Sequence, residues 1–198
     1  MSMRRLSRKA LPCDSIALAR YLIGKTLVRE LPQGRLAGRI VETEAYLPGD
    51  AACHACGGLT PRNRALFMAP GHAYVYFIYG NHFMLNVSSE AEGVGAGVLL
   101  RAVEPLEGVG LMQEHRGLVR LRELSNGPGK LAQAFSINMR LYGRDYCAPG
   151  PLWLADAMRP VGRIGKSRRI GINKNAHRLL RFYERGNPFV SGPKNMRN

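Results

Sequence analysis

The sequence contains no long hydrophobic run and little cysteine, and each absence argues against a class of protein. No stretch approaches the roughly twenty consecutive apolar residues that a transmembrane helix needs, and the N-terminal residues are basic and soon polar, unlike a signal peptide. Four cysteines in 198 residues do not make a disulfide scaffold. We therefore expect a soluble, cytoplasmic protein without a membrane partner. The cysteines are Cys13, Cys53, Cys56 and Cys147.

Acidic residues are also scarce. The chain has 14 Asp and Glu against 29 Lys and Arg, for a formal charge of +15, and 23 of the basic residues are Arg. Because the planar guanidinium binds phosphate well, this composition favours a nucleic-acid partner. The alternative is a basic surface without a specific partner. Residues 159–197 concentrate the charge, with Glu184 as the only acid, and their interspersed apolar residues predict a folded basic face.

Several cofactor motifs are missing. There is no Gly-rich phosphate loop of the Lys-Ser/Thr kind, which argues against a nucleotide cofactor and nucleotide hydrolysis. The H-x-E and P-C-x-x-C pair of zinc deaminases is absent as well. The run Cys53-His54-Ala55-Cys56 invites a zinc interpretation, but no second Cys/His pair lies at ligand spacing. We therefore expect no metal and no cofactor.

With 45% apolar residues, the chain has enough material for one folded domain. We expect a basic flexible arm at residues 1–12 and a single domain at residues 13–198. Hydrophobic periodicity and turn residues predict mixed secondary structure. The expected helices are 14–23, a short one starting at Thr60-Pro61, 106–124 broken at Gly110 and Gly117, and one within 125–137. The expected strands are 25–31, 35–46, 98–105 and short runs within 152–156, 163–172 and 179–186, with a hairpin over 72–89 that turns at Gly80-Asn81.

Glu44 is the strongest catalytic candidate on local pattern. In a strand, alternation puts Glu42 and Glu44 on one face, with Val41 and Thr43 on the other. A carboxylate at a strand end that enters a Gly-rich loop can reach a cleft and act as a general base on water. The alternative is an ordinary carboxylate that faces solvent.

Arg101 interrupts an otherwise apolar strand, so its charge needs a partner. A pair with Glu44 would keep that carboxylate ionised and oriented. A purely structural pair with Glu104 or Glu42 is equally compatible with the sequence.

The expected hairpin is rich in tyrosine. Alternation puts Tyr74 and Tyr76 on one face, and Tyr79 lies at the tip, where it could wedge between bases. Tyr76 facing Tyr46 could sandwich a flat ring, an interaction worth roughly 1–3 kcal/mol per base. The alternative is ordinary cross-strand aromatic packing.

A set of motifs in fixed order resembles the alkyladenine (3-methyladenine) DNA glycosylase family. The resemblance covers nearly the whole chain from Asp14 onward. The motifs are RIVETEAY, the H-x-x-GG of His54–Gly58, TPRN at Thr60–Asn63, FMxPGxxYVYxIYG at Phe67–Gly80, NxSS at Asn86–Ser89, VLLRAxEPLEG at Val98–Gly108, GPxKLxQA at Gly127–Ala134 and LRFYxRGxPxVS at Leu180–Ser191.

The resemblance implies roles for individual residues. Glu44 matches the general base that activates water, and Arg101 matches the arginine that helps to hold that water. Tyr46, His54 and Tyr76 match the walls between which a flipped base stacks, and the His54 amide would read the 6-position of the purine. Tyr79 matches the residue that fills the gap in the duplex, and Asn86 matches the residue that hinders guanine.

The resemblance also implies an overall fold and activity. We expect a single α+β domain in which helices flank a curved, mainly antiparallel sheet and a protruding β-hairpin enters the DNA minor groove. The implied function is that of a monofunctional DNA glycosylase in base excision repair. It would act as a monomer on damaged double-stranded DNA, flip alkylated or deaminated purines (3-methyladenine, 7-methylguanine, hypoxanthine, ethenoadenine) and excise them by hydrolysis. No lysine lies near Glu44 in the sequence to form a Schiff base, so AP lyase activity is not expected.

Two other functions predict different behaviour. A non-catalytic nucleic-acid-binding module of the same fold would bind tightly and release no base. An RNA- or ribosome-associated protein would prefer RNA to duplex DNA at a fixed salt concentration.

Overall fold

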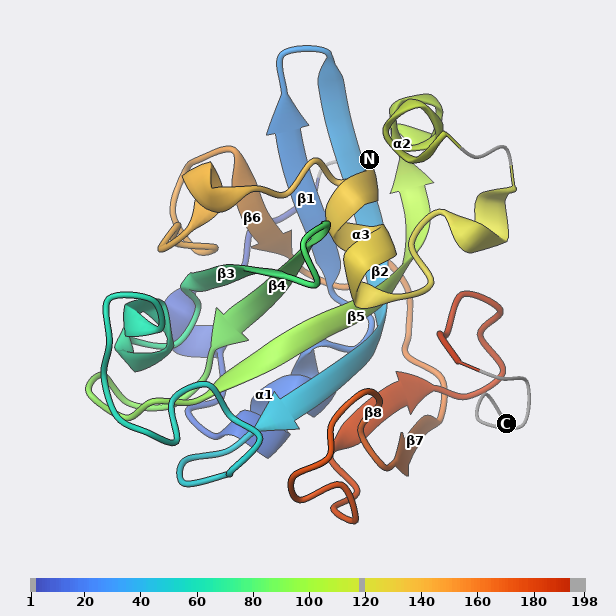
Figure 1. Ribbon diagram of the computed structural model, residues 1–198. Coiled ribbons are helices and arrows are strands. Elements are labelled where there is room, and N and C mark those ends of the chain that lie inside the picture. Colours follow the sequence, from blue (N-terminus) through green and yellow to red (C-terminus); the bar gives the residue numbers. More distant parts are fainter. Residues whose placement is uncertain (1–2, 118–119, 193–198) are drawn as a thin grey trace.

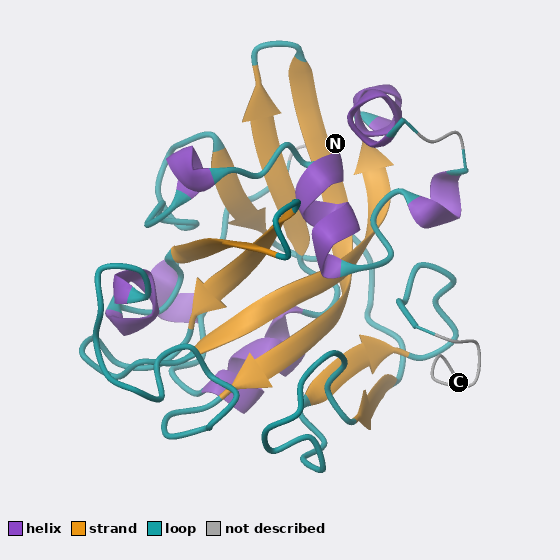
Figure 2. Cartoon of the chain, viewed as in Figure 1, coloured by secondary structure: helices purple, strands orange, loops and turns teal. Residues whose placement is uncertain are grey.

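The fold is built on one curled antiparallel sheet, seen in a computed structural model that describes residues 3–117 and 120–192 (Figures 1 and 2). The main path of the sheet has the order β3-β4-β5-β2-β1-β6, and β8 adds to β2 and pairs with β7. All of the pairings are antiparallel. The strands are β1 (Thr26–Leu31), β2 (Gly34–Tyr46), β3 (Ala73–Ile78), β4 (His82–Ser88), β5 (Gly97–Glu107), β6 (Leu152–Ala155), β7 (Ile164–Ser167) and β8 (Arg181–Glu184).

Three α-helices in the described residues flank this sheet, which confirms the predicted α+β arrangement. They are α1 (Ser15–Leu22), α2 (Val109–Arg116) and α3 (Pro128–Ala134). The Asp14 carboxylate accepts a hydrogen bond from the Ala17 amide and caps α1, and α1 packs against β2 and β5. Figure 1 shows α3 crossing over the strands, where it packs against β4 and β5. None of the helices in these described ranges is long and apolar enough to cross a membrane.

Strand β2 carries the two central glutamates and departs from regular pairing beside them. Its register against β5 shifts between Ile40 and Glu42 and again between Glu42 and Thr43. Beyond the shift, Thr43 turns toward α1, where its hydroxyl donates to the Ala19 carbonyl at 2.9 Å. Irregular pairing of this kind bends a strand and redirects its side chains. Glu44, which alternates with Thr43, is thereby directed away from α1.

The β3–β4 hairpin turns one residue earlier than expected. Ile78 pairs with His82, which leaves Tyr79, Gly80 and Asn81 as a three-residue turn. Tyr79 has φ of +56°, and Gly80 has φ of +71°. The left-handed conformation of a bulky aromatic residue is uncommon, and here it puts the Tyr79 ring at the exposed tip.

Residues 3–12 pack against the domain, which differs from the expectation of a flexible arm. Leu6 and Leu11 are buried, and the Leu6 amide donates to the Leu154 carbonyl at 2.9 Å. Arg8–Ala10 form a 3-10 turn. The two leucines provide apolar anchors that the charge of this segment obscured.

Three expectations about other segments also need correction. The helix expected from Thr60 begins at Arg64 and is a 3-10 turn (Arg64–Phe67), because Thr60 and Asn63 hydrogen-bond to each other and close a separate turn. Gly110 lies inside α2, whereas Gly117 ends it in the left-handed conformation. The basic face was predicted over residues 159–197, of which 193–197 lie outside the described residues. Within residues 159–192 the Arg169 and Arg181 side chains are fully buried, so they do not belong to a surface.

Candidate active site

Glu44 lies at the centre of a buried polar cluster. Its carboxylate is 0% exposed, and its Oε1 lies 3.3 Å from Nη1 of Arg101 and accepts a 2.8 Å hydrogen bond from the Ile170 amide. Its Oε2 accepts the Tyr46 hydroxyl at 3.0 Å. Glu44 is therefore not the solvent-facing carboxylate that the local pattern allowed. Burial and the nearby charge of Glu42 raise its pKa above the ordinary value, although the Arg101 charge and the hydrogen bonds from Ile170 and Tyr46 act in the opposite direction.

Glu42 lies two residues away and has a different environment. It accepts hydrogen bonds from Nε of Arg101 at 2.8 Å and Nε of Arg181 at 2.7 Å. The amide and hydroxyl of Ser191 donate to it at 2.6 and 2.8 Å. Burial alone would raise the pKa of Glu42, but Arg101, Arg181 and these hydrogen bonds hold it below the ordinary value. Glu42 thus remains an anion that anchors both guanidinium groups.

Arg101 contacts both central glutamates. This resolves the alternatives for its partner, because Glu104 instead pairs with Arg159 at 2.5 Å. The carboxylates of Glu42 and Glu44 raise the pKa of Arg101 despite its burial, so the guanidinium stays charged. Its orientation is fixed from the Glu42 side, and its Nη1 is directed to Glu44.

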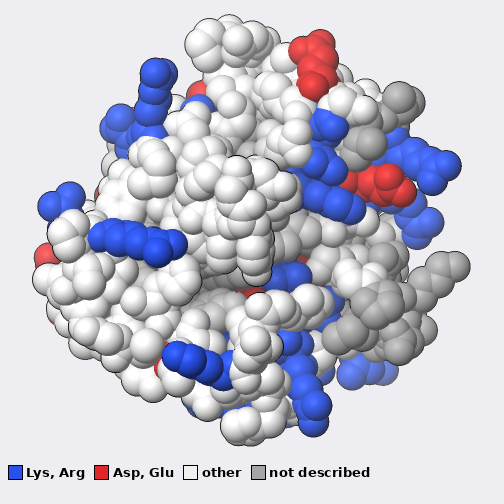
Figure 3. Space-filling view, viewed as in Figure 1, with Lys and Arg blue, Asp and Glu red and all other residues white. Residues whose placement is uncertain are grey.

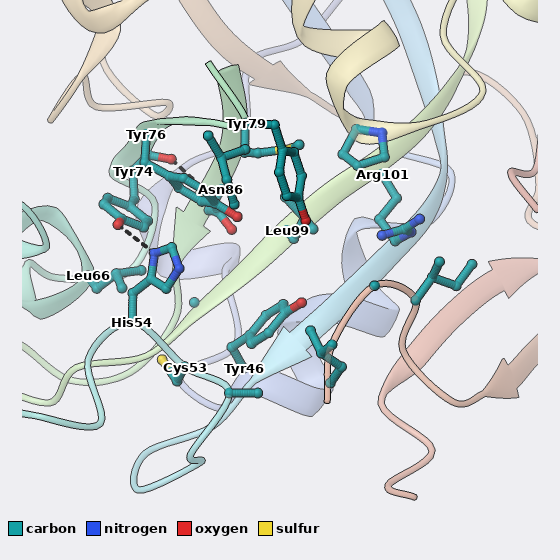
Figure 4. Close-up of a pocket in the computed structure, with 18 residues that line it drawn as sticks. Tyr46, Cys53, His54, Leu66, Tyr74, Tyr76, Tyr79, Asn86, Leu99 and Arg101 are labelled. Carbon is teal, nitrogen blue, oxygen red and sulfur yellow. Dashed lines mark hydrogen bonds between the residues drawn. The ribbon is translucent and has the colours of Figure 1, made fainter. Parts of the chain in front are cut away.

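Next to this cluster is a cavity of about 320 Å³ with aromatic walls (Figure 4). Tyr46 projects into it from β2, whereas Tyr74 and Tyr76 project from β3. Glu44 itself is not exposed to the cavity, but three of its contacts, Arg101, Tyr46 and Ile170, line it. The labelled lining residues are Tyr46, Cys53, His54, Leu66, Tyr74, Tyr76, Tyr79, Asn86, Leu99 and Arg101.

His54 joins the aromatic wall from the loop that follows β2. Its ring lies 4.5 Å from the Tyr76 ring, and its Nδ1 is 2.8 Å from the Tyr74 hydroxyl. Tyr74 and Tyr76 are stacked at 5.3 Å. Burial and the charge of Arg62 lower the pKa of His54, and burial raises the pKa of Tyr76 to about 12, so both rings are neutral near pH 7. The wall therefore offers uncharged faces to a flat ring.

The last two predicted site residues, Asn86 and Tyr79, lie at different depths in the cavity. Asn86 is buried on β4 and donates from Nδ2 to the Tyr74 carbonyl at 3.1 Å, so it forms part of the cavity floor. Tyr79 is 73% exposed and extends from the hairpin turn at the cavity mouth. All seven predicted site residues, Glu44, Arg101, Tyr46, His54, Tyr76, Asn86 and Tyr79, thus lie at or directly behind one cavity.

Several contributors were not identified from the sequence. Tyr74 had been placed on the same strand face as Tyr76, a pattern that could have revealed its role. Ile170 contributes a backbone amide, which any residue other than proline would provide, so the sequence contains no signal for it. Asp50 and Arg169, a buried ion pair behind Tyr46, come from segments far apart in the chain and likewise have no local signature.

The two cysteines of the Cys-His-Ala-Cys run have different surroundings. Cys53 lines the cavity, whereas Cys56 is exposed. The parts of the chain that the structure describes contain no cluster of three or more His, Cys, Asp or Glu side chains that could hold a metal ion. The thiol of Cys53 has its pKa raised by burial to about 11, so it is protonated near neutral pH.

The surface around the cavity is basic. Figure 3 shows Lys and Arg side chains bordering a hollow on the face that Figure 1 presents. The geometry therefore combines a pocket shaped for a flat ring, a buried carboxylate behind it and a rim suited to phosphate.

Comparison with known proteins agrees with this geometry. Residues 9–188 match the family model for methylpurine-DNA glycosylase. Proteins carrying the name "Putative 3-methyladenine DNA glycosylase" are 59% identical in Mesorhizobium japonicum and 50% identical in Paraburkholderia phytofirmans, and the alignments cover 96% of this chain and 92% and 90% of those proteins. One from Methanocella arvoryzae is 49% identical over 89% of this chain and 90% of its own length. The chain belongs to the methylpurine-DNA glycosylase family.

Proposed function

We propose that the protein is a monofunctional DNA glycosylase that excises alkylated or deaminated purines from duplex DNA. One observation carries the proposal: a fully buried carboxylate, Glu44, has a raised pKa and contacts three groups that line an aromatic cavity. Family membership supplies the reaction class, and the cavity supplies room for one base. We propose that the protein acts as a cytoplasmic monomer and associates with the nucleoid when it works on DNA.

The proposed reaction begins when the damaged nucleotide leaves the base stack. Unstacking and unpairing cost a few kcal/mol, and the cost is lowest for damaged or poorly paired bases. The exposed ring of Tyr79 would enter the minor groove and occupy the gap, which offsets part of this cost. The basic rim would bind phosphates without reading the sequence.

The flipped base would stack between Tyr46 on one side and His54 with Tyr76 on the other. A purine nucleotide alkylated at N3 or N7 is cationic, so the electron-rich face of a neutral tyrosine would bind it better than a normal base. The His54 backbone amide would donate to the 6-position of the purine. Asn86 on the cavity floor would meet the 2-amino group of guanine and disfavour its entry.

Hydrolysis would use Glu44 as the general base. The carboxylate would take a proton from water as the water oxygen bonds to C1′ of the deoxyribose, and the electrons of the broken glycosidic bond would leave with the base. Arg101 reaches both the cavity and Glu44, so it would help to hold this water. The anionic carboxylate would also stabilise the positive charge that develops on the sugar. A neutral lesion such as hypoxanthine would in addition need protonation by a general acid.

We propose that the reaction stops at base release. Strand cleavage by a lyase needs an amine that forms a Schiff base. No lysine is among the cavity-lining residues of the described chain, and Arg101 cannot serve as that nucleophile because its guanidinium stays charged.

The test is single-turnover release of hypoxanthine and 3-methyladenine from duplex DNA with EDTA present, comparing wild type with Glu44→Gln. We expect release by wild type and a loss of about 100-fold or more in the variant, because general-base catalysis contributes about 10²–10⁴-fold. Glu114→Gln, on the exposed side of α2, is the matched control and should behave as wild type.

The other outcomes separate the rival functions. If wild type binds lesion DNA but releases neither base, the protein is a non-catalytic binding module. If Glu44→Gln retains the wild-type rate, the base that activates water is a different residue. Preference for RNA over duplex DNA in a competition at fixed salt would favour an RNA-associated function.

A further inference from the structure

Behind Tyr46, a buried ion pair joins the two loops that close one side of the cavity. The Asp50 carboxylate lies 2.6 Å from Nη1 of Arg169, and both side chains are 0% exposed. Asp50 belongs to the loop after β2 that carries His54, whereas Arg169 lies in the loop between β7 and β8, next to Ile170. The two residues are therefore far apart in sequence but meet at the site.

Asp50 organises the loop that holds His54. Its Oδ1 accepts hydrogen bonds from the Ala52 amide at 3.0 Å and from Nδ2 of Asn175 at 2.9 Å, and its carbonyl accepts the Cys53 amide at 2.7 Å. Burial would raise the pKa of Asp50, but Arg169, Asn175 and the Ala52 amide hold it below the ordinary value. The carboxylate is thus a charged anchor at the base of this wall.

Arg169 acts on the other side of the same pair. Its guanidinium lies over the Tyr46 ring at 4.6 Å, and its Nη1 donates to the Ala45 carbonyl at 3.0 Å. The next residue, Ile170, donates its amide to Glu44. A shift of Arg169 would therefore move both the Tyr46 wall and one of the three groups that contact Glu44.

We propose that Asp50 and Arg169 are positioning residues, which together fix the Tyr46 ring against the bound base and hold the Ile170 amide on Glu44. This inference rests on the proposed glycosylase function. Neither side chain lines the cavity, so both act through the residues that they hold. Positioning of this kind affects rate strongly, because a displacement of about 1 Å can cost about 100-fold.

Asp50 supplies the negative charge that compensates the buried guanidinium of Arg169. In the described chain, Nε and Nη2 of Arg169 have no hydrogen-bond partner, and Asp50 is the acid within ion-pair distance. Removing either partner would leave the other charge buried and uncompensated, which is unfavourable. The loops would then relax apart, so the effect should appear in the geometry of the site as well as in the stability of the fold.

The experiment compares Arg169→Gln, Asp50→Asn and the double variant with wild type in single-turnover excision of hypoxanthine across pH. We expect each single variant to lose about tenfold to 100-fold in rate and much less in lesion-DNA affinity, because the basic rim still binds the phosphates. The double variant should lose no more than either single one, because the two residues act as one unit. Arg169→Lys keeps the charge opposite Asp50 and should recover part of the rate.

The dependence of the excision rate on pH distinguishes a positioning role from an effect on the stability of the fold alone. The Ile170 amide stabilises ionised Glu44, so its displacement raises the pKa of Glu44 further and moves the acidic limb of the profile to higher pH. Arg39→Gln is the control, because Arg39 forms a similarly buried pair with Glu184 away from the cavity. This control should lower the melting temperature and leave the profile in place.

Asn175→Gly gives a milder perturbation of the same anchor if Arg169→Gln fails to fold. Asn175 has φ of +50°, which glycine adopts readily, so the change removes the hydrogen bond to Asp50 without straining the backbone. We expect the same upward shift of the acidic limb, on a smaller scale. An unshifted limb and a wild-type rate in the folded variants would overturn the positioning role while leaving excision by wild type intact. Absence of excision by wild type would instead refute the proposed function and, with it, the positioning role.

Discussion

Neutralising Glu42 should cost the protein a large part of its stability. Glu42 accepts hydrogen bonds from Arg101 and Arg181 and two from Ser191, all in the buried interior. In Glu42→Gln the shape is kept but the anion is lost, and Arg181 keeps only neutral acceptors on Ser167 and Ser191. Breaking a buried ion pair by removing one partner costs about 3–5 kcal/mol, and we expect a loss in that range.

Urea unfolding measures this loss. With a urea dependence of about 2 kcal/mol per molar, the midpoint should fall by about 1.5–2.5 M. The control is Arg4→Gln, which removes a pair with Asp156 in which the Arg4 side chain is 84% exposed, and it should cost less than about 1 kcal/mol. Equal losses in the two variants would refute the reasoning, because burial would then not determine the cost.

The loss of stability in Glu42→Gln should also depend on pH. The folded-state pKa of Glu42 is lowered, so its contribution to stability is present above the unfolded value of about 4.3 and is lost as pH falls through the folded value. The difference in unfolding free energy between wild type and Glu42→Gln should therefore narrow below about pH 4. A difference that stays constant into acid would show that Glu42 is not the stabilising anion.

Two further predictions concern the tyrosines. Tyr46→Phe keeps the ring but removes the hydroxyl that donates to Glu44, so the pKa of Glu44 should rise. The acidic limb of the plot of single-turnover rate against pH should therefore move to higher pH. An unchanged acidic limb would show that this hydrogen bond does not influence the ionisation of Glu44. Tyr79→Ala removes the exposed aromatic ring at the hairpin tip and should weaken lesion-DNA binding by about tenfold or more in a titration, because stacking is worth roughly 1–3 kcal/mol per base. Tyr79→Phe is the matched control and should bind as wild type does.

The parts of the site that could be predicted from the sequence depend on local periodicity. Alternation put Glu42 with Glu44, and Tyr74 with Tyr76, because successive residues of a regular strand face opposite sides. The apolar strand around Arg101 likewise showed that this charge would be buried and paired. The sequence left its partner open because both glutamates and Glu104 were compatible with the pattern.

The remaining contacts are non-local, which is why the sequence did not show them. Arg181 and Ser191 reach Glu42 from positions 139 and 149 residues later, and Asp50 meets Arg169 across two loops. Local propensity does not indicate which distant charges will pair. The count of basic residues therefore suggested a basic surface, whereas Arg169 and Arg181 are buried. The three-residue hairpin turn was missed for a different reason. The Gly80-Asn81 pair favoured a two-residue turn, whereas Tyr79 adopts the left-handed conformation itself.

The two glutamates on β2 have pKa values shifted in opposite directions, although they lie two residues apart on one strand. Glu42 receives two arginines and a backbone amide, and its pKa falls, so it stays charged and orders the interior. Glu44 shares Arg101 with it at a longer distance, receives a tyrosine hydroxyl and one amide, and its pKa rises, so it can exchange a proton nearer to neutral pH. The charge of Glu42 contributes to this separation, because it opposes ionisation of Glu44. The raised pKa of Glu44 therefore depends in part on a neighbouring carboxylate that stays ionised.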